Sequence, residues 1–330
     1  MPPRSPLPQR HGLEAAWLCT PERDRPGHTQ PTWPTMGAWL QERLAESVSV
    51  AEFLAGGRFV YENGTPVAGA DRYRPTTFVW FHRDLADEPV VPGLLHLIYR
   101  DDRIVVIDKP PFLSSIPRGR HVVQSVVVRL RAQLGLPELS PLHRLDRVTS
   151  GLLVLATERR WRGTYQTLFQ RGVVNKVYRA LAPLSPHLDL PVTVRNHLAT
   201  RPGEWQGEVV PGAPVNAESV IELEGEHGEA GQYRLTPRTG RTHQLRLHML
   251  GLGIPIVDDP LYPVVQDVSV HDFRRPLQLL ASELAFTDPI DGGARRFESV
   301  RRLPLPAETA GACSVEASRG GPPGGDEHSA

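Results

Sequence analysis

Apolar residues between positions 36 and 82 follow two patterns, one with helical spacing and one typical of strands. The strand part is interrupted by Glu62-Asn63-Gly64, a sequence common in hairpin turns. We therefore expect a compact subdomain of two short helices and a small sheet. The predicted elements are helices over 38–48 and 50–54 and strands over 58–61 and 77–81.

A longer series of strands and helices begins near residue 98. Its clearest strands, 104–107 and 152–156, are short apolar runs bounded by turn residues, as buried strands are. We expect Asp108-Lys109-Pro110-Pro111 to end the first of them. The other predicted elements are helices over 122–134 (stopped by Gly135) and 158–170, a strand over 173–180, and antiparallel strands over 190–235.

Local composition predicts five parts along the chain. The first part is rich in Pro and Arg and is expected to be extended, either lying on the body or disordered, and the last is rich in Gly, Ser and Glu. These parts are an arm over 1–34, a small subdomain over 35–85, a linker over 86–97, the main domain over 98–304 and a disordered tail over 305–330.

Of the 330 residues, 40% are hydrophobic and 22% charged, as in ordinary soluble globular proteins. No apolar run is long enough to cross a bilayer, and the N-terminus lacks a signal peptide's apolar segment. Cys19 and Cys313 lie at opposite ends, which argues against a disulfide framework or a thiolate metal site. We expect a cytoplasmic protein without membrane segments or bound metal.

The formal net charge of zero hides a strongly basic block. Residues 118–179 hold eleven arginines and one lysine against three carboxylates, a net charge of +9. Such a block predicts a polyanionic partner. The alternative is that many of these arginines are merely solvated.

The stretch HRLDRVTSGLLVLA, residues 143–156, places a polar loop directly before a buried strand. Asp146 lies between Arg144 and Arg147, so we expect a lowered pKa and an ionised carboxylate. A structural salt bridge is one alternative. A serine hydrolase using Ser150, His143 and Asp146 is another, but the chain has no G-x-S-x-G elbow and these residues are too close in sequence.

A second polar stretch, RTGRTHQLRLHML over 238–250, fits a strand by alternation and a helix by its end signals. We favour a helix capped by Thr242 and stopped by Gly251, in which Thr242, Arg246 and Met249 share one face. Arg238, Arg241 and the helix N-terminus would then bind a phosphate, unless the stretch is only a solvated basic helix. On the strand over 173–180, Lys176 and Tyr178 point to the same side, where the tyrosine could stack on a base or simply pack.

Four stretches together resemble the RluA-type RNA pseudouridine synthases. They are DDRIVVIDKPPFLSSIP, HRLDRVTSGLLVLA, NKVYRALAP and RTGRTHQLRLHMLGLGIPIVDDPLY, which occur in the family's order and span most of residues 98–290. The Pro/Arg-rich N-terminus and RPLQLLASELAFTDP are similar to one bacterial subgroup. Residues 36–82 resemble, over a short span, the S-four-type RNA-binding module; a plain structural subdomain is the alternative.

The resemblance implies an α+β pseudouridine synthase fold, with a mixed, mainly antiparallel sheet, a central basic cleft and a small S-four-like subdomain. It implies an isomerase that converts uridine to pseudouridine in structured RNA without a cofactor. Ribosomal RNA is the favoured substrate and transfer RNA the second, and we expect a monomer. A non-catalytic RNA-binding protein on the same fold is the alternative.

The resemblance also assigns roles to residues. Asp146 would catalyse, Arg246 would pair with it, Tyr178 would lie against the uracil and assist proton removal at C5, and Arg144 would hold the flipped-out nucleotide. Lys176, Arg238, Arg241, Thr242 and His243 are the remaining expected substrate contacts. Many family members have Leu-His-Ala at 279–281 and Gly-Asp at 258–259, where this chain has Leu-Leu-Ala and Asp-Asp. We expected neither difference to touch Asp146, Tyr178, Arg246 or Arg144.

Overall fold

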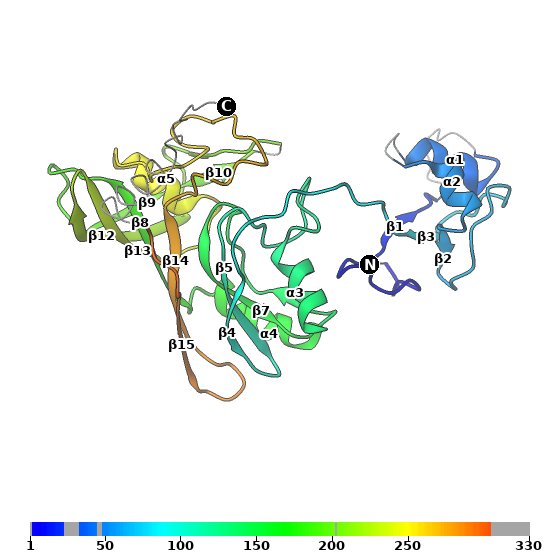
Figure 1. Cartoon of the computed structure of the whole chain (residues 1–330), viewed down its shortest axis with the longest axis horizontal. Coiled ribbons are helices and arrows are strands. Elements are labelled where there is room, and N and C mark those ends of the chain that lie inside the picture. The colour runs from blue at the N-terminus through cyan, green and yellow to red at the C-terminus, as the bar shows by residue number, and fades with distance from the viewer. Residues whose placement is uncertain (1, 23–32, 45–47, 202, 305–330) are drawn as a thin grey trace, which may run out of the picture. The chain divides into compact units, whose positions relative to one another are not determined.

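The computed structural model describes residues 2–22, 33–44, 48–201 and 203–304 and divides into two units (Figure 1). The first contains Met1–Glu88 and Ile116–Leu139, and the second contains Pro89–Ser115 and Ser140–Ala330. The predicted division at 34, 85, 97 and 304 stays a prediction, although residues 116–139 group here with the first unit. The tail and residues 23–32 of the arm lie outside the described residues.

The first unit contains the helices and strands expected between residues 36 and 82. A three-stranded antiparallel sheet in the order β1-β3-β2 carries them, and its first strand comes from the predicted arm. The N-terminus of α1 is capped by Thr35, whose hydroxyl accepts the Ala38 N–H at 3.1 Å. The elements are β1 (Ala16–Cys19), α1 (Met36–Arg43), α2 (Val50–Ala55), β2 (Val60–Tyr61) and β3 (Phe78–Phe81).

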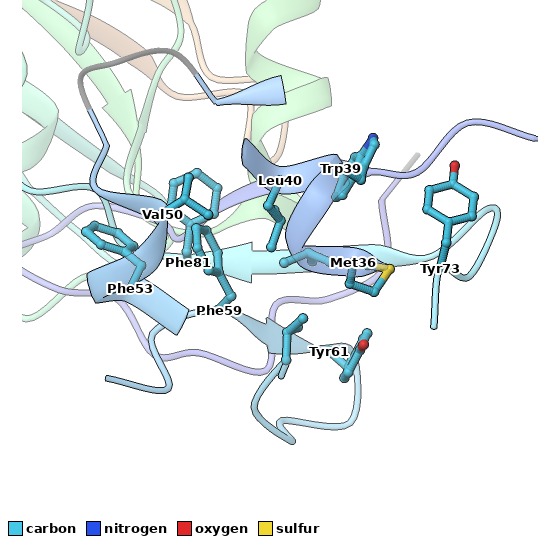
Figure 2. Close-up of a cluster of buried hydrophobic side chains, with 11 residues drawn as sticks. Met36, Trp39, Leu40, Val50, Phe53, Phe59, Tyr61, Tyr73 and Phe81 are labelled. Carbon is cyan, nitrogen blue, oxygen red and sulfur yellow. The ribbon is translucent and has the colours of Figure 1, made fainter. Parts of the chain in front are cut away.

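The core of this unit is a cluster of side chains from both helices and one face of the sheet (Figure 2). The rings of Phe53, Phe59 and Phe81 lie 5.1–6.3 Å apart, a spacing at which aromatic edges and faces attract. Strand alternation directs Val79 and Phe81 into this cluster and Trp80 into a smaller one with Val60. The similarity to the S-four module stays a prediction.

Helix α3 (Val126–Leu134) also belongs to the first unit and ends at Gly135, whose φ of 65° is left-handed, as predicted. It begins four residues later than expected. The Glu88 carboxylate accepts the backbone N–H groups of Val122, Val123 and Gln124 at 2.7–2.9 Å, so these residues form a turn around the carboxylate. Glu88, which the sequence placed in a linker, is therefore a structural residue of this unit.

The second unit is built on a ten-stranded sheet in the order β4-β5-β7-β14-β8-β13-β12-β9, with β15 beside β14 and β6 beside β7. All pairings are antiparallel except that of β7 with β14. The mixed, mainly antiparallel sheet confirms the predicted fold class. The strands are β4 (His96–Arg100), β5 (Ile104–Lys109), β6 (Ser140–Pro141), β7 (Ser150–Ala156), β8 (Asn175–Pro183), β9 (Val192–Asn196), β12 (Ala217–His227), β13 (Ala230–Pro237), β14 (Leu279–Thr287) and β15 (Ala294–Glu298).

Two helices and a hairpin complete the second unit. Helix α4 (Arg159–Gln170) begins at the predicted place and packs Tyr165 into the core between the sheet and the helix. Helix α5 (Gln244–Gly251) packs Leu247 beside a hairpin of β10 (Leu198–Thr200) and β11 (Gly207–Val209). Among the described residues, no helix is both long and apolar enough to span a bilayer.

Strand β5 continues through Asp108 and Lys109, where we had expected it to end. Both side chains are fully buried, and both have polar partners. Asp108 accepts hydrogen bonds from the Ser299 hydroxyl at 2.7 Å and the Val300 N–H at 2.8 Å. Because a satisfied polar group can remain inside a sheet, the strand ends only at Pro110.

The parallel contact of β7 with β14 depends on a glycine. Gly151 lies opposite Ala281 with a φ of 110°, and a Cβ there would lie 2.3 Å from the Ala281 carbonyl oxygen. Its neighbour Leu280, which stands where the family resemblance implies His, is buried against Leu181 and Leu303. The 279–281 difference is therefore a change in the core, and β7 can approach β14 only because residue 151 has no side chain.

Replacing Gly151 by Ala should destabilise the protein by more than about 3 kcal/mol, because a left-handed φ and a backbone clash combine. Gly292→Ala is the matched control: its φ is 72°, but a Cβ there meets nothing within 4 Å. The control should cost only about 1 kcal/mol. Urea unfolding of both variants measures the difference, and equal midpoints would mean that the β7–β14 contact relaxes freely.

Candidate active site

Hydrogen bonds to the backbone hold the loop before β7 in place on both sides of Asp146. The Ser115 hydroxyl donates to the Leu145 carbonyl at 2.7 Å and accepts the Leu145 N–H at 3.1 Å. On the other side, the Lys109 ammonium donates to the Arg147 carbonyl at 3.1 Å. The Asp146 side chain remains about one-third exposed. The fold thus presents one partly accessible carboxylate on an immobilised backbone.

The buried ammonium of Lys109 connects this loop to the segment that follows β5. Its ammonium also donates to the carbonyls of Pro110 at 3.0 Å and Leu113 at 2.8 Å. Burial lowers the pKa of Lys109 to about 7, and the nearby charge of Asp146 opposes that shift. The sequence predicted only a strand end at this lysine, because its three carbonyl partners come from loops that residue patterns do not bring together.

Arg246, on α5, is the cation beside Asp146. Its Nη1 lies 3.2 Å from Asp146 Oδ2, and its side chain is 1% exposed. Arg144 is exposed, while Arg147 packs over the Phe112 ring and donates to the Phe112 carbonyl at 3.5 Å. The expected pairing of Asp146 with its two neighbours in sequence is wrong, since the loop directs both arginines away from it.

Helix α5 confirms the helical interpretation of 238–250, but Thr242 is not its cap. His243 occupies that position with a left-handed φ of 55°, and the helix includes Gly251. The Gln244 side chain organises the turn: its Oε1 accepts the Arg241 N–H at 3.0 Å and the Thr239 hydroxyl at 2.7 Å. Thr242 is consequently exposed, whereas Arg246 and Met249 are buried, so the three do not share one face.

Asp259 forms a buried two-point ion pair with Arg246. Asp259 Oδ2 lies 2.8 Å from Nε and Oδ1 lies 2.5 Å from Nη2. The family pattern Gly-Asp differs from this chain at residue 258 alone, so the contact of Asp259 with Arg246 is one that the sequence did not predict. Asp258 has a φ of 58°, a region that favours glycine, and pairs with Arg275.

His243 connects Asp146 to Tyr262. Its Nε2 lies 3.7 Å from Asp146 Oδ2, and its Nδ1 lies 2.9 Å from the Tyr262 hydroxyl. That hydroxyl accepts the Gly207 N–H at 2.7 Å, which ties β11 to the same network. Burial lowers the pKa of His243, and the charge of Asp146 opposes this, so the imidazole is neutral near pH 7.

Tyr178 and Lys176 lie on β8, as predicted. Burial, followed by the charge of Asp146, raises the pKa of Tyr178, which keeps its phenol protonated. Lys176 donates to the Thr239 carbonyl at 3.3 Å, and burial lowers its pKa.

The remaining predicted contacts lie near the start of α5 or on the Asp146 loop. Arg238 and Arg241 are exposed; Arg238 Nε lies 3.2 Å from a Glu218 carboxylate oxygen, and Arg241 Nε donates to the Asn216 carbonyl at 3.1 Å. In the described part of the chain, Arg241 and Arg144 have no carboxylate partner. These two cations are therefore available to an anionic ligand.

Several arginines of the basic block serve the fold instead. Arg131 donates to the carbonyls of Leu139 at 3.0 Å and Gly12 at 3.1 Å. Arg179 binds Glu224 at 2.7 Å, and Arg160 binds Glu158 at 2.8 Å. The net charge of the block therefore overstates the number of free cations.

The serine hydrolase alternative is wrong. His143 Nε2 accepts the Val154 N–H at 3.2 Å, and its ring stacks on Phe169 with centroids 4.5 Å apart. The Ser150 hydroxyl donates to the Leu279 carbonyl at 3.3 Å. Both side chains are used within the fold, so no nucleophile–base pair forms with Asp146.

Comparison with known proteins identifies the family and agrees with the fold. The family described as RNA pseudouridylate synthase matches residues 103–250. The dual-specificity RNA pseudouridine synthase RluA of Salmonella typhi is 32% identical over 218 residues, covering 64% of this chain and 94% of the relative. That of Vibrio vulnificus is 34% identical over 203 residues, covering 58% and 78%.

Solved structures give the same fold. The human RNA pseudouridylate synthase domain-containing protein 4 aligns with a TM-score of 0.50 and 24% identity, covering 63% of this chain and 88% of that one. The fold is thus that of the pseudouridylate synthases. The chain belongs to the RluA-type family and is an isomerase that converts uridine in RNA to pseudouridine. The non-catalytic alternative is set aside, and the assignment to a subgroup with an N-terminal extension stays a prediction.

The environment of His143 predicts a pH dependence of stability. Burial lowers the pKa of His143 to about 3, below the value near 6.5 of an unfolded chain. Between these values the unfolded state binds more protons, so stability falls as pH drops from about 6.5 toward 3. His143→Gln should make this slope shallower in urea unfolding across that range, although the lost stacking lowers stability at neutral pH. A slope identical to the parent's would assign the acid sensitivity to other groups.

Proposed function

We propose that Asp146 is the catalytic carboxylate of this synthase. The observation that carries the proposal is its position, partly exposed on a fastened loop and 3.2 Å from a buried guanidinium. An adjacent cation favours the ionised form of a carboxylate. In this proposal the Arg246 guanidinium holds the Asp146 carboxylate in one orientation and compensates its charge.

The chemistry of the reaction accounts for this requirement. The N1–C1′ bond of uridine must break, the uracil must turn, and C5 must bond to C1′. A carboxylate can attack C1′, stabilise cationic character at the sugar or remove a proton. Reactant and product are isomers, so the conversion has no net oxidation or reduction and requires no redox cofactor.

Tyr178 is proposed to lie against the uracil of the target nucleotide. Its protonated phenol suits stacking and hydrogen-bond donation better than proton abstraction in the free enzyme. If Tyr178 assists proton removal at C5, the phenol must first lose its proton or act with a second base. Asp146, whose charge already acts on Tyr178, is the nearest such group in this proposal.

The remaining predicted substrate contacts form two groups, one exposed and one enclosed. Exposed Arg144, Arg238 and Arg241 and exposed Thr242 are suited to the RNA backbone, whereas enclosed Lys176 and neutral His243 are suited to the nucleotide in the site. A uridine must leave its stack to reach these groups, and the RNA must therefore be gripped on either side. We propose ribosomal RNA as the main substrate and transfer RNA as a second, acted on by a cytoplasmic monomer. The dual specificity in the names of the RluA relatives supports more than one RNA target.

Asp146→Asn should retain the fold and RNA binding but lose isomerisation, since the amide is neutral and a poor nucleophile. Tritium release from RNA labelled at uridine C5 measures turnover, and filter binding measures affinity. Asp108→Asn is unsuitable as a control because that buried carboxylate has structural partners; Asp258→Asn removes a more peripheral charge and should stay active. Turnover near the parent rate in Asp146→Asn would remove this residue from the mechanism.

Arg241→Ala should weaken binding to every substrate RNA and reduce the slope of log K against log salt by about one unit, because one phosphate contact is lost. Arg296→Ala is a control on β15, which extends away from α5 in Figure 1. The control should leave the salt slope unchanged. If both variants bind as tightly as the parent at every salt concentration, the RNA backbone does not pass over the start of α5.

A further inference from the structure

The guanidinium of Arg246 is divided between two carboxylates. Asp259 takes Nε and Nη2 at 2.8 and 2.5 Å, while Asp146 takes Nη1 alone at 3.2 Å. An arginine fork normally binds a single carboxylate through two parallel bonds. Here that stronger arrangement is formed with Asp259, whose side chain is 1% exposed.

Asp259 is itself immobilised. Its Oδ1 accepts the backbone N–H groups of Leu261 at 2.8 Å and Tyr262 at 3.1 Å, in addition to Arg246. The Tyr262 ring also lies beneath the guanidinium, with 5.1 Å between the Arg246 Cζ atom and the ring centroid. The segment 259–262 therefore fixes both the plane and the charge environment of Arg246.

We propose that Asp259 is a positioning residue for the isomerisation, a proposal that rests on Asp146 being the catalytic carboxylate. By occupying the Nε–Nη2 edge of the guanidinium, Asp259 leaves Nη1 of Arg246 as the donor to Asp146. Its negative charge also offsets part of the positive charge that Asp146 experiences. Arg246 then orients Asp146 without binding it so strongly that the carboxylate loses nucleophilicity.

The charged and titratable groups that face Asp146 show what a change at Asp259 would alter. They are Arg246 on α5, His243 before α5, Lys109 on β5 and Tyr178 on β8. Asp259 acts on Asp146 through Arg246, and Tyr262 acts on it both through His243 and by direct charge interaction. Neutralising Asp259 removes the two-point partner of Arg246. The positive charge next to Asp146 is then less compensated.

Asp259→Asn should therefore reduce kcat by about 10²-fold while KM for RNA stays near the parent value, since a small displacement of Arg246 misplaces Asp146. Asp258→Asn is the matched control. It removes the adjacent carboxylate, tolerates the same left-handed backbone, and should change neither quantity.

The outcomes separate positioning from simple folding. A parental kcat for Asp259→Asn would overturn the proposal, and so would a fall in kcat accompanied by a raised KM and a lowered urea midpoint, which indicates a structural role alone. If Asp259→Asn fails to fold, Asp259→Glu keeps the charge but lengthens the side chain. This variant should lower kcat at an unchanged KM, and a parental kcat would overturn the proposal. An active Asp146→Asn enzyme would instead refute the proposed function, whatever the Asp259 variants do.

Discussion

The buried guanidinium of Arg246 is the group on which the site depends. A cation with 1% exposure is tolerated only when anions and hydrogen-bond acceptors surround it. Asp146 and Asp259 supply that compensation from positions 100 residues before and 13 residues after it. The requirement to satisfy one charge thus brings together the loop before β7, helix α5 and the segment after it. The chemistry and the packing of this region cannot be changed independently.

Burial has a second effect on the groups around Asp146. It keeps Tyr178 protonated and His243 neutral, and it places the pKa of Lys109 at about 7. Asp146 is the partly exposed carboxylate among these enclosed groups. In the proposed reaction the substrate would meet this carboxylate among otherwise neutral or cationic groups, which suits a reaction that develops positive character at the sugar.

Periodicity and end signals predicted most of the helices and the clearest buried strands, including the helix that carries Arg246. The family motifs predicted that Asp146 pairs with Arg246. The local sequence alone predicted Arg144 and Arg147 as the partners of Asp146. The role of Asp259 was missed because a carboxylate in a loop gives no indication of which distant charge it meets. The start of α5 was misplaced for a related reason: the amide of Gln244 organises the turn, and propensity favoured Thr242.

The binding of Glu88 by residues 122–124 has a consequence for biosynthesis. The first unit is discontinuous in the chain, and its second piece ends at Leu139. During synthesis it cannot be completed when residue 88 leaves the ribosome, because its last helix has yet to be translated. The intervening residues 89–115, which include β4 and β5, emerge first and must wait for their own partner β7. Synthesis of the second unit therefore begins before the first unit is complete, and neither unit is finished before the other has started.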